Sequence, residues 1–297
     1  GSLVSTTANS DTMAPVTGDM LAGAGYFNDA VVDYLNGQLG VVQYYNKVLT
    51  ADEVSDLYDE YSYRYPIVSN LQLQYLVADY AGTGTVLPDS SGNSYDGTLV
   101  NGLTQDGKSF VYDGTSDYIY TPNMYSTFNA NRNITLEVWY NPTWTGQGEG
   151  GTVVSEVSSI AYDNWHYSMM EHRRAPFGAL AYDYAGFWTG TGVTAVNPLM
   201  TTTGWRQIVL TYDGTTGRSY TNAGTAKEVV TSRYVPWIEG SVNSFILALG
   251  HGDASQQSGA GANYFKGNIG IVRVYNRALS STEITANYNS TKAVYGL

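Results

Sequence analysis

The residues best suited to chemistry form one short polar loop, Asp89-Ser-Ser-Gly-Asn93-Ser-Tyr-Asp96. Asp and Asn side chains supply the oxygen ligands that Ca²⁺ prefers, and glycine allows the tight turn that brings them together. The loop lacks the spacing of a complete calcium-binding loop, and Asx side chains also close turns without a metal. Asp89, Asn93 and Asp96 are therefore the candidate calcium ligands, with turn closure as the alternative. No other cofactor is expected.

The sequence contains none of the usual catalytic motifs. Two carboxylates at alternate positions of a strand face the same way and can divide acid and nucleophile roles, but Glu137 is alone in its strand. His166 and His172 are two of only three His and are not spaced as a zinc pair. G-x-S-x-G and the phosphate-binding loops are absent. The cluster Glu171–Arg174 is either a ligand patch or a solvated turn, and we expect no enzymatic activity.

Aromatic residues are concentrated between Ile160 and Gly190. Exposed rings there would stack on sugar faces, and Trp165 and Trp188 are the candidate glycan-binding residues. Packing along a strand face is the alternative for about half of these rings. Two sequences, at Asn133 and Asn289, match the N-glycosylation pattern, which acts only in a secretory pathway.

The composition restricts the possible partners. The chain has 14 Lys plus Arg against 26 Asp plus Glu, a formal charge of −12, which opposes binding to nucleic acid or to an anionic membrane. No apolar run reaches the roughly 20 residues that a membrane-spanning helix needs, so we expect no membrane insertion. Cysteine is absent, which excludes disulfides and thiolate metal sites. The first residues lack a signal-peptide pattern, so a signal was removed or the chain is part of a longer protein.

The elements that position these residues are short strands separated by turns. From about Ile67, clusters of Gly, Asp, Ser and Asn alternate with apolar or period-two runs such as "ITLEVWY". In that run Ile134, Leu136, Val138 and Tyr140 are predicted on one face, with Glu137 on the other. Many short strands at this spacing predict an antiparallel β-sandwich.

One strand-and-helix unit occurs twice, at a constant offset of 230 residues. "GQLGVVQYYNKVLTADEV" (37–54) matches "GNIGIVRVYNRALSSTEI" (267–284), and eight residues are identical over the 24 columns from Leu35 to Tyr58. Thr50-x-x-Glu53 and Ser280-x-x-Glu283 are both capping boxes that predict short helices.

The order of these motifs resembles the laminin-G-like, concanavalin-A-like jelly rolls. "PDSSGNSYDGTLVNG", "FVYDGTSDYIYTP", "NITLEVWYNP", "GWRQIVLTYDG" and "FKGNIGIVRVYNRALSSTEI" follow one another as that family's turn, hairpin and strand motifs do. The resemblance implies an all-β antiparallel jelly-roll sandwich with a short capped helix after the last strand, and often a calcium ion at its rim. Residues 66–297 would form one complete domain, and residues 1–65 the C-terminal portion of a second, partial jelly roll.

These observations favour a non-catalytic extracellular structural or adhesive protein. Residues 1–65 would need a partner, either another copy of the chain bound head-to-tail in a filament or an adjoining domain of the same polypeptide. A carbohydrate-binding module of a larger polysaccharide-acting enzyme is the main alternative, and a viral fibre or capsid surface protein is the next. The expected location is extracellular or on a cell or virion surface, with glycans as possible partners.

Overall fold

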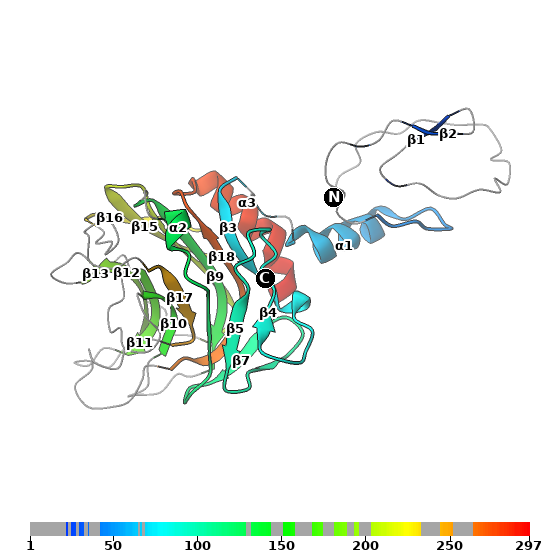
Figure 1. The fold of residues 1–297 in the computed structure, drawn as a ribbon. Helices are drawn as coiled ribbons and strands as arrows, with labels where there is room; N and C mark the ends of the chain where they lie inside the picture. Colours follow the sequence, from blue (N-terminus) through cyan, green and yellow to red (C-terminus); the bar gives the residue numbers. More distant parts are fainter. Residues whose placement is uncertain are drawn as a thin grey trace. The chain divides into compact units, whose positions relative to one another are not determined.

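The computed structural model describes most of the chain, in two units. The described residues are 22, 25–27, 30–32, 35, 42–64, 66, 69–128, 132–143, 151–157, 168–174, 181–188, 193–195, 203–232, 244–251 and 264–297. The first compact unit is Gly1–Tyr63 and the second is Arg64–Leu297. Figure 1 shows the fold and labels most of its helices and strands.

The described residues of the first unit form one hairpin and one helix. The strands β1 (Gly25–Phe27) and β2 (Ala30–Val32) pair antiparallel. Helix α1 (Ala51–Ser62) begins at the predicted capping box, in which Glu53 N donates to Thr50 Oγ1 and Thr50 N donates to the Glu53 carboxylate.

The second unit is a sandwich of two antiparallel sheets. The first sheet, called the tyrosine sheet below, has eight strands in the spatial order β13 (Val193–Ala195), β12 (Ala181–Trp188), β11 (Ser168–Arg174), β10 (Gly151–Val157), β17 (Ile246–Leu249), β8 (Tyr118–Tyr120), β5 (Gly97–Val100) and β4 (Val86–Leu87).

The second sheet, called the helix sheet, packs against helix α3 (Ser281–Thr291). Its strands are β16 (Lys227–Val230), β15 (Thr216–Thr221), β14 (Arg206–Tyr212), β9 (Ile134–Pro142), β18 (Lys266–Tyr275), β7 (Phe110–Asp113) and β6 (Thr104–Gln105), with β3 (Leu71–Tyr75) also paired to β18. The described part of the unit also contains the short helical segments η1 (Val77–Asp79), α2 (Tyr125–Phe128) and η2 (Lys292–Tyr295).

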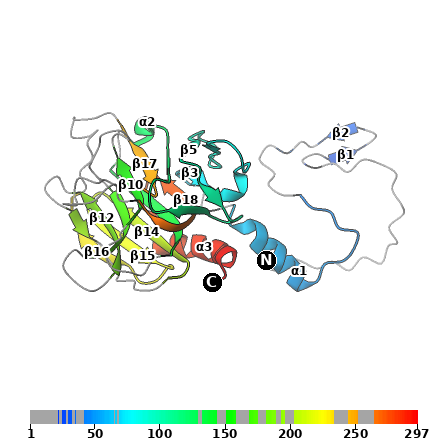
Figure 2. The ribbon, with the colours of Figure 1, turned by 90° about the horizontal axis from the view of Figure 1, so that it is seen from below.

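The core lies between the two sheets, and the predicted alternation in β9 is confirmed. Ile134, Leu136, Val138 and Tyr140 belong to the main buried cluster. Glu137 lies on the opposite face, which α3 covers, so both faces of β9 are buried. Figure 2 shows α3 along the outer side of this sheet. The fold prediction, an all-β antiparallel sandwich with a short capped helix after the last strand, is thereby confirmed.

Helix α3 starts at the second predicted capping box. Glu283 N donates to Ser280 Oγ, Ser280 N donates to the Glu283 carboxylate, and Arg277 forms two hydrogen bonds of 2.6 and 2.9 Å with the same carboxylate. These bonds satisfy free amides of the first helical turn and place a negative charge at the helix N-terminus.

We predict that Glu283→Gln lowers the free energy of unfolding by about 1 kcal/mol at pH 7. The hydrogen bonds from Arg277 lower the pKa of Glu283 from its ordinary value of 4.5 to about 2. A depressed pKa in the folded state stabilises the fold above pH 4.5, and this contribution is lost as the pH falls towards 2. Urea denaturation at pH 7 and pH 2.5 should therefore show the difference from wild type shrinking at the lower pH. A difference that stays constant with pH would contradict this explanation.

Candidate functional site

A cluster of rings on the outer face of the tyrosine sheet is the strongest candidate binding surface. Strand β8 reads Tyr-Ile-Tyr: Ile119 points into the core, so Tyr118 and Tyr120 point outward and are half-buried. The Tyr118 ring centroid lies 6.2 Å from that of Tyr120, 5.1 Å from His251 and 6.4 Å from Tyr264. His251 and Tyr264 are 4.9 Å apart. These four residues are called the tyrosine patch.

Three separate segments bring the patch together. Tyr118 and Tyr120 come from β8, His251 follows the end of β17, and Tyr264 precedes β18. Gly250 turns the chain between β17 and His251 with a φ of +81°, a conformation that L-residues rarely adopt. A Cβ at this position would lie 2.2 Å from the Tyr112 ring. The position of His251 therefore depends on a glycine that precedes it.

The patch combines apolar ring faces with polar tips. Burial, and then the neighbouring phenols of Tyr264 and Tyr120, raise the pKa of Tyr118, so this phenol is neutral at physiological pH. Neutral phenols both donate and accept hydrogen bonds, while their faces offer apolar contact area. None of the four side chains is a carboxylate. The arrangement suits contact with a ring-shaped polar ligand, such as a sugar.

The three predicted calcium ligands do lie in one loop, where they hold the loop by hydrogen bonds. The Asp89 carboxylate accepts from Gln74 N at 3.0 Å and from Tyr95 N at 3.0 Å, and from both the backbone N and the hydroxyl of Ser91. Asp96 Oδ1 accepts from Asp89 N. Hydrogen bonds of this kind are those by which Asx side chains close a turn without a metal.

Asn93 is turned towards the neighbouring strand. Its amide Nδ2 donates to the carbonyls of Leu71 and Gln72 and to the hydroxyl of Ser91. Within the described part of the chain, no group of three or more His, Asp or Glu side chains is arranged to hold a metal ion. Calcium binding at Asp89, Asn93 and Asp96 stays a prediction.

Neither of the two predicted tryptophans has a described side chain. Trp165 is outside the described residues, as is His166. Trp188 is the last residue of β12, and its side chain is not described. Glycan binding by Trp165 and Trp188 stays a prediction.

One predicted glycosylation site lies just before β9 and the other lies on α3. Asn133 is half-buried just before β9, and Asn289 is exposed on α3. The hydroxyls two residues further on are both buried: Thr135 Oγ1 donates to the Arg277 carbonyl at 2.7 Å, and Thr291 Oγ1 accepts from Arg273 at 3.4 Å. Glycan attachment at Asn133 and Asn289 stays a prediction.

A buried polar network centred on Glu137 lies under α3. Glu137 Oε1 accepts from Arg273 Nη1 at 2.7 Å and from Gln207 Nε2 at 2.9 Å, and Oε2 accepts from Asn287 Nδ2 at 2.9 Å. Glu137 and Arg273 are both 0% exposed, and Arg273 Nε also donates to Gln74. The network therefore ties α3 to four strands of the helix sheet.

Aromatic stacking continues this contact along the helix. Trp139 stacks on Tyr288 at 5.5 Å and on Tyr295 at 4.9 Å, and Tyr295 stacks on Trp205 at 4.1 Å. Tyr295 Oη accepts from Ile271 N, directly beside Gly270, where a Cβ would lie 2.0 Å from that oxygen. Gly270, which the two copies of the repeated motif share, therefore leaves space for the Tyr295 side chain.

No helix among the described residues is both long and apolar enough to span a membrane. No curated protein sequence matches the chain.

Solved structures share the fold at low sequence identity. Trypanosoma rangeli sialidase in complex with sialic acid is 14% identical with a TM-score of 0.56, over 77% of this chain and 34% of the sialidase. The binding domain of botulinum neurotoxin serotype D/C is 11% identical with a TM-score of 0.59, over 75% of this chain and 53% of that domain.

A structure of botulinum neurotoxin type C is also 11% identical, with a TM-score of 0.58 over 75% of this chain and 52% of the other; cell entry of that toxin depends on interaction with two ganglioside molecules. The chain thus spans about a third of the sialidase and half of the toxin chains. At these identities the likeness shows the fold alone. A family model described as the Concanavalin A-like lectin/glucanases superfamily matches residues 113–285, more than half of the 297 residues, and the chain belongs to this superfamily.

Proposed function

We propose that the Arg64–Leu297 unit is a non-catalytic, glycan-binding jelly roll whose contact surface is the tyrosine patch. The observation that carries this proposal is the gathering of Tyr118, Tyr120, His251 and Tyr264, from three chain segments, on the outside of a sheet. Core packing does not account for rings that face outward. The surface offers both apolar ring faces and hydroxyl groups, and a sugar ring likewise has apolar faces and hydroxyl groups.

The comparisons are consistent with this proposal. The superfamily includes lectins by its description, and two of the structural neighbours are solved with sialic acid or described with gangliosides. Binding without turnover is the proposed activity of the tyrosine patch. An extracellular location, or one on a cell or virion surface, fits such a role.

Replacing Tyr118 with alanine should weaken glycan binding at least tenfold, because Tyr118 contacts every other ring of the patch. Titration calorimetry with sialylated and neutral oligosaccharides measures the change. Tyr44→Ala is the matched control, since Tyr44 is 75% exposed and belongs to the first unit. Equal affinity of wild type and Tyr118→Ala would refute the assignment of the site, provided that circular dichroism shows both proteins folded.

A second candidate function is attachment through residues 1–65, either to an adjoining jelly-roll domain of the same polypeptide or to a neighbouring subunit in a head-to-tail assembly. It treats residues 1–65 as the C-terminal portion of a partial jelly roll. The specific observation in its favour is the exposure of large apolar side chains around α1: Val42, Tyr44, Tyr45, Val48, Val54 and Tyr58. Such a protein would serve a structural or adhesive role at a surface.

A further inference from the structure

We propose that the segment Val42–Ser62 docks on the sheet of another concanavalin-A-like jelly roll, one with a neutral residue where this chain has Glu137. The segment is called the docking segment. The proposal rests on the attachment function above and names the partner: an adjoining jelly-roll domain of different sequence, rather than a second copy of this chain.

The chain contains its own template for the docked state. Residues 272–292 lie at an offset of 230 from the docking segment. The two capping boxes have the same hydrogen bonds, and the ion pair of Lys47 with Glu53 repeats that of Arg277 with Glu283. The local structure of the two helix starts is therefore the same.

The burial of the two copies differs strongly. In the template, Val272 is 2%, Tyr275 is 0% and Ile284 is 1% exposed. Their counterparts in the docking segment, Val42, Tyr45 and Val54, are 56%, 36% and 42% exposed. Residues 42–45 are in no strand, whereas residues 272–275 pair with both β3 and β9. The docking segment thus has the side chains of a covered element, but in the described part of the chain these side chains are exposed.

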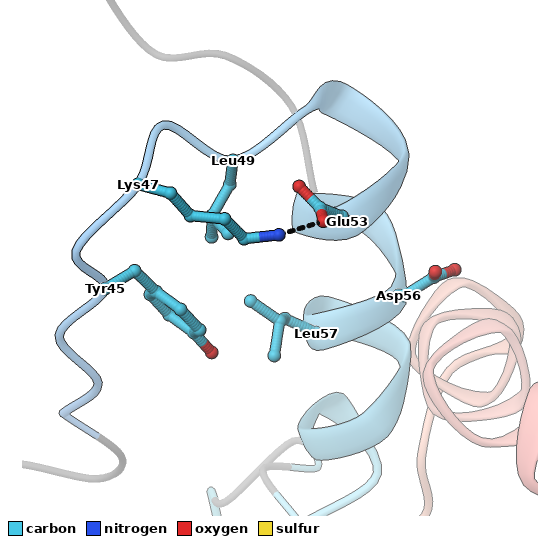
Figure 3. A pocket seen from close by; sticks show the side chains of 6 residues that line it. All are labelled: Tyr45, Lys47, Leu49, Glu53, Asp56 and Leu57. Atoms are coloured by element: carbon cyan, nitrogen blue, oxygen red, sulfur yellow. Dashed lines mark hydrogen bonds and ion pairs between the residues drawn. The ribbon is translucent and has the colours of Figure 1, made fainter.

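A pocket marks the place where the partner would enter. An open space of about 240 Å³ lies between the docking segment's loop and α1 (Figure 3), and its lining residues are Tyr45, Lys47, Leu49, Glu53, Asp56 and Leu57. In the template, Tyr275 and Leu279 pack instead against side chains of three strands: Leu71 of β3, Val209 of β14 and Tyr220 of β15. Aliphatic and aromatic side chains from a sheet face therefore fit the apolar part of the pocket, formed by Tyr45, Leu49 and Leu57. Lys47, Glu53 and Asp56 form its charged part.

Two differences between the copies exclude the sheet of this chain as the natural partner. Arg273 and Asn287, which hold the buried Glu137 carboxylate, correspond to Gln43 and Leu57. Docking on a sheet that carries Glu137 would leave a buried carboxylate without its cation and opposite a leucine, which is strongly unfavourable. A sheet with a neutral residue at that position removes the conflict, so the pair Gln43/Leu57 selects the partner.

The experiment adds a sheet of known sequence to the full chain. A copy of residues 66–230 is fused in front of residue 1, so that the docking segment follows it at the spacing that β18 and α3 have in the second unit. Three fusions are compared: the copy with Glu137, the copy with Glu137→Gln, and the Glu137 copy combined with Gln43→Arg and Leu57→Asn in the docking segment. Amide hydrogen exchange of α1 is the readout.

The Glu137→Gln fusion should slow exchange in α1 at least tenfold relative to the unfused chain, and the Glu137 fusion should not. Gln43→Arg with Leu57→Asn should restore the protection in the Glu137 fusion. Equal protection with Glu137 and with Glu137→Gln would overturn the identity of the partner but leave attachment standing. If α1 is protected neither in the Glu137→Gln fusion nor in the compensated fusion, the attachment function itself is wrong. A dimer of the unfused chain with protected α1 amides would also overturn the proposal, in favour of a second copy.

Discussion

Replacing Glu137 with alanine should lower the free energy of unfolding by about 3 to 5 kcal/mol. The change leaves the Arg273 guanidinium fully buried without the carboxylate that lies 2.7 Å away. It also removes one of the two acceptors of the Asn287 amide, which holds α3 to the sheet; the other acceptor is Tyr275 Oη. Urea denaturation followed by tryptophan fluorescence measures the loss, because Trp139 lies beside Glu137 under the helix.

An exposed ion pair supplies the matched control for this change. Glu228→Ala breaks a 2.8 Å contact with Arg218, but the Glu228 side chain is 55% exposed, so the expected loss is about 0 to 1 kcal/mol. The double replacement Glu137→Leu with Arg273→Met should cost less than Glu137→Ala, since no charge is left buried alone. The account of the network is wrong if Glu137→Ala costs no more than Glu228→Ala.

Replacing Gly250 with alanine should lower the free energy of unfolding by about 2 to 5 kcal/mol. The residue has a φ of +81°, and its new Cβ would lie 2.2 Å from the buried Tyr112 ring. Either the ring or the chain before His251 must shift, and the second shift would disturb the tyrosine patch. The melting temperature and the glycan affinity of the variant should therefore both be lower than those of the wild type.

Gly84→Ala separates the backbone strain at positive φ from the steric clash with Tyr112 as causes of the expected loss of stability. Gly84 has nearly the same φ, +83°, and no atom lies within 4 Å of the position that an alanine methyl would take, so only the backbone strain of about 1 kcal/mol is expected. If Gly250→Ala and Gly84→Ala cost the same, the close approach of Tyr112 does not matter and the argument for the position of His251 fails.

Local patterns were sufficient to predict the fold. The alternation from Ile134 to Tyr140 defines the two faces of β9, and both capping boxes begin helices where the pattern places them. These signals lie within a few residues of each other along the chain. The order of the turn and strand motifs then indicated the jelly roll, which the family match confirms.

The contacts between distant strands were not predicted. Glu137 and Arg273 are separated by 136 residues, and only the register of β9 with β18 places them opposite each other. The one available signal was a charged residue on the non-core face of each strand, and that pattern is equally typical of a solvated face. The helix that covers the face turns an exposed pair into a buried one.

The tyrosine patch was missed for a similar reason. Tyr118 belonged to a predicted strand, but His251 and Tyr264 lie at the two ends of a glycine-rich stretch more than 130 residues away. Trp165 and Trp188 were predicted instead because aromatic residues are dense around them in the sequence. The loop of Asp89 illustrates the opposite case, in which the residues come together and each one bonds within the loop or to the neighbouring strand.

Mapping a bound oligosaccharide by NMR tests the central claim most directly. In ¹⁵N- and aromatic-¹³C-labelled full chain, addition of a ligand chosen from a glycan array should shift the resonances of Tyr118, Tyr120, His251 and Tyr264, and few elsewhere. Shifts centred on the Asp89–Asp96 loop or on Trp165 and Trp188 would place glycan binding at another site. Absence of binding to every glycan on the array would contradict the proposed function itself.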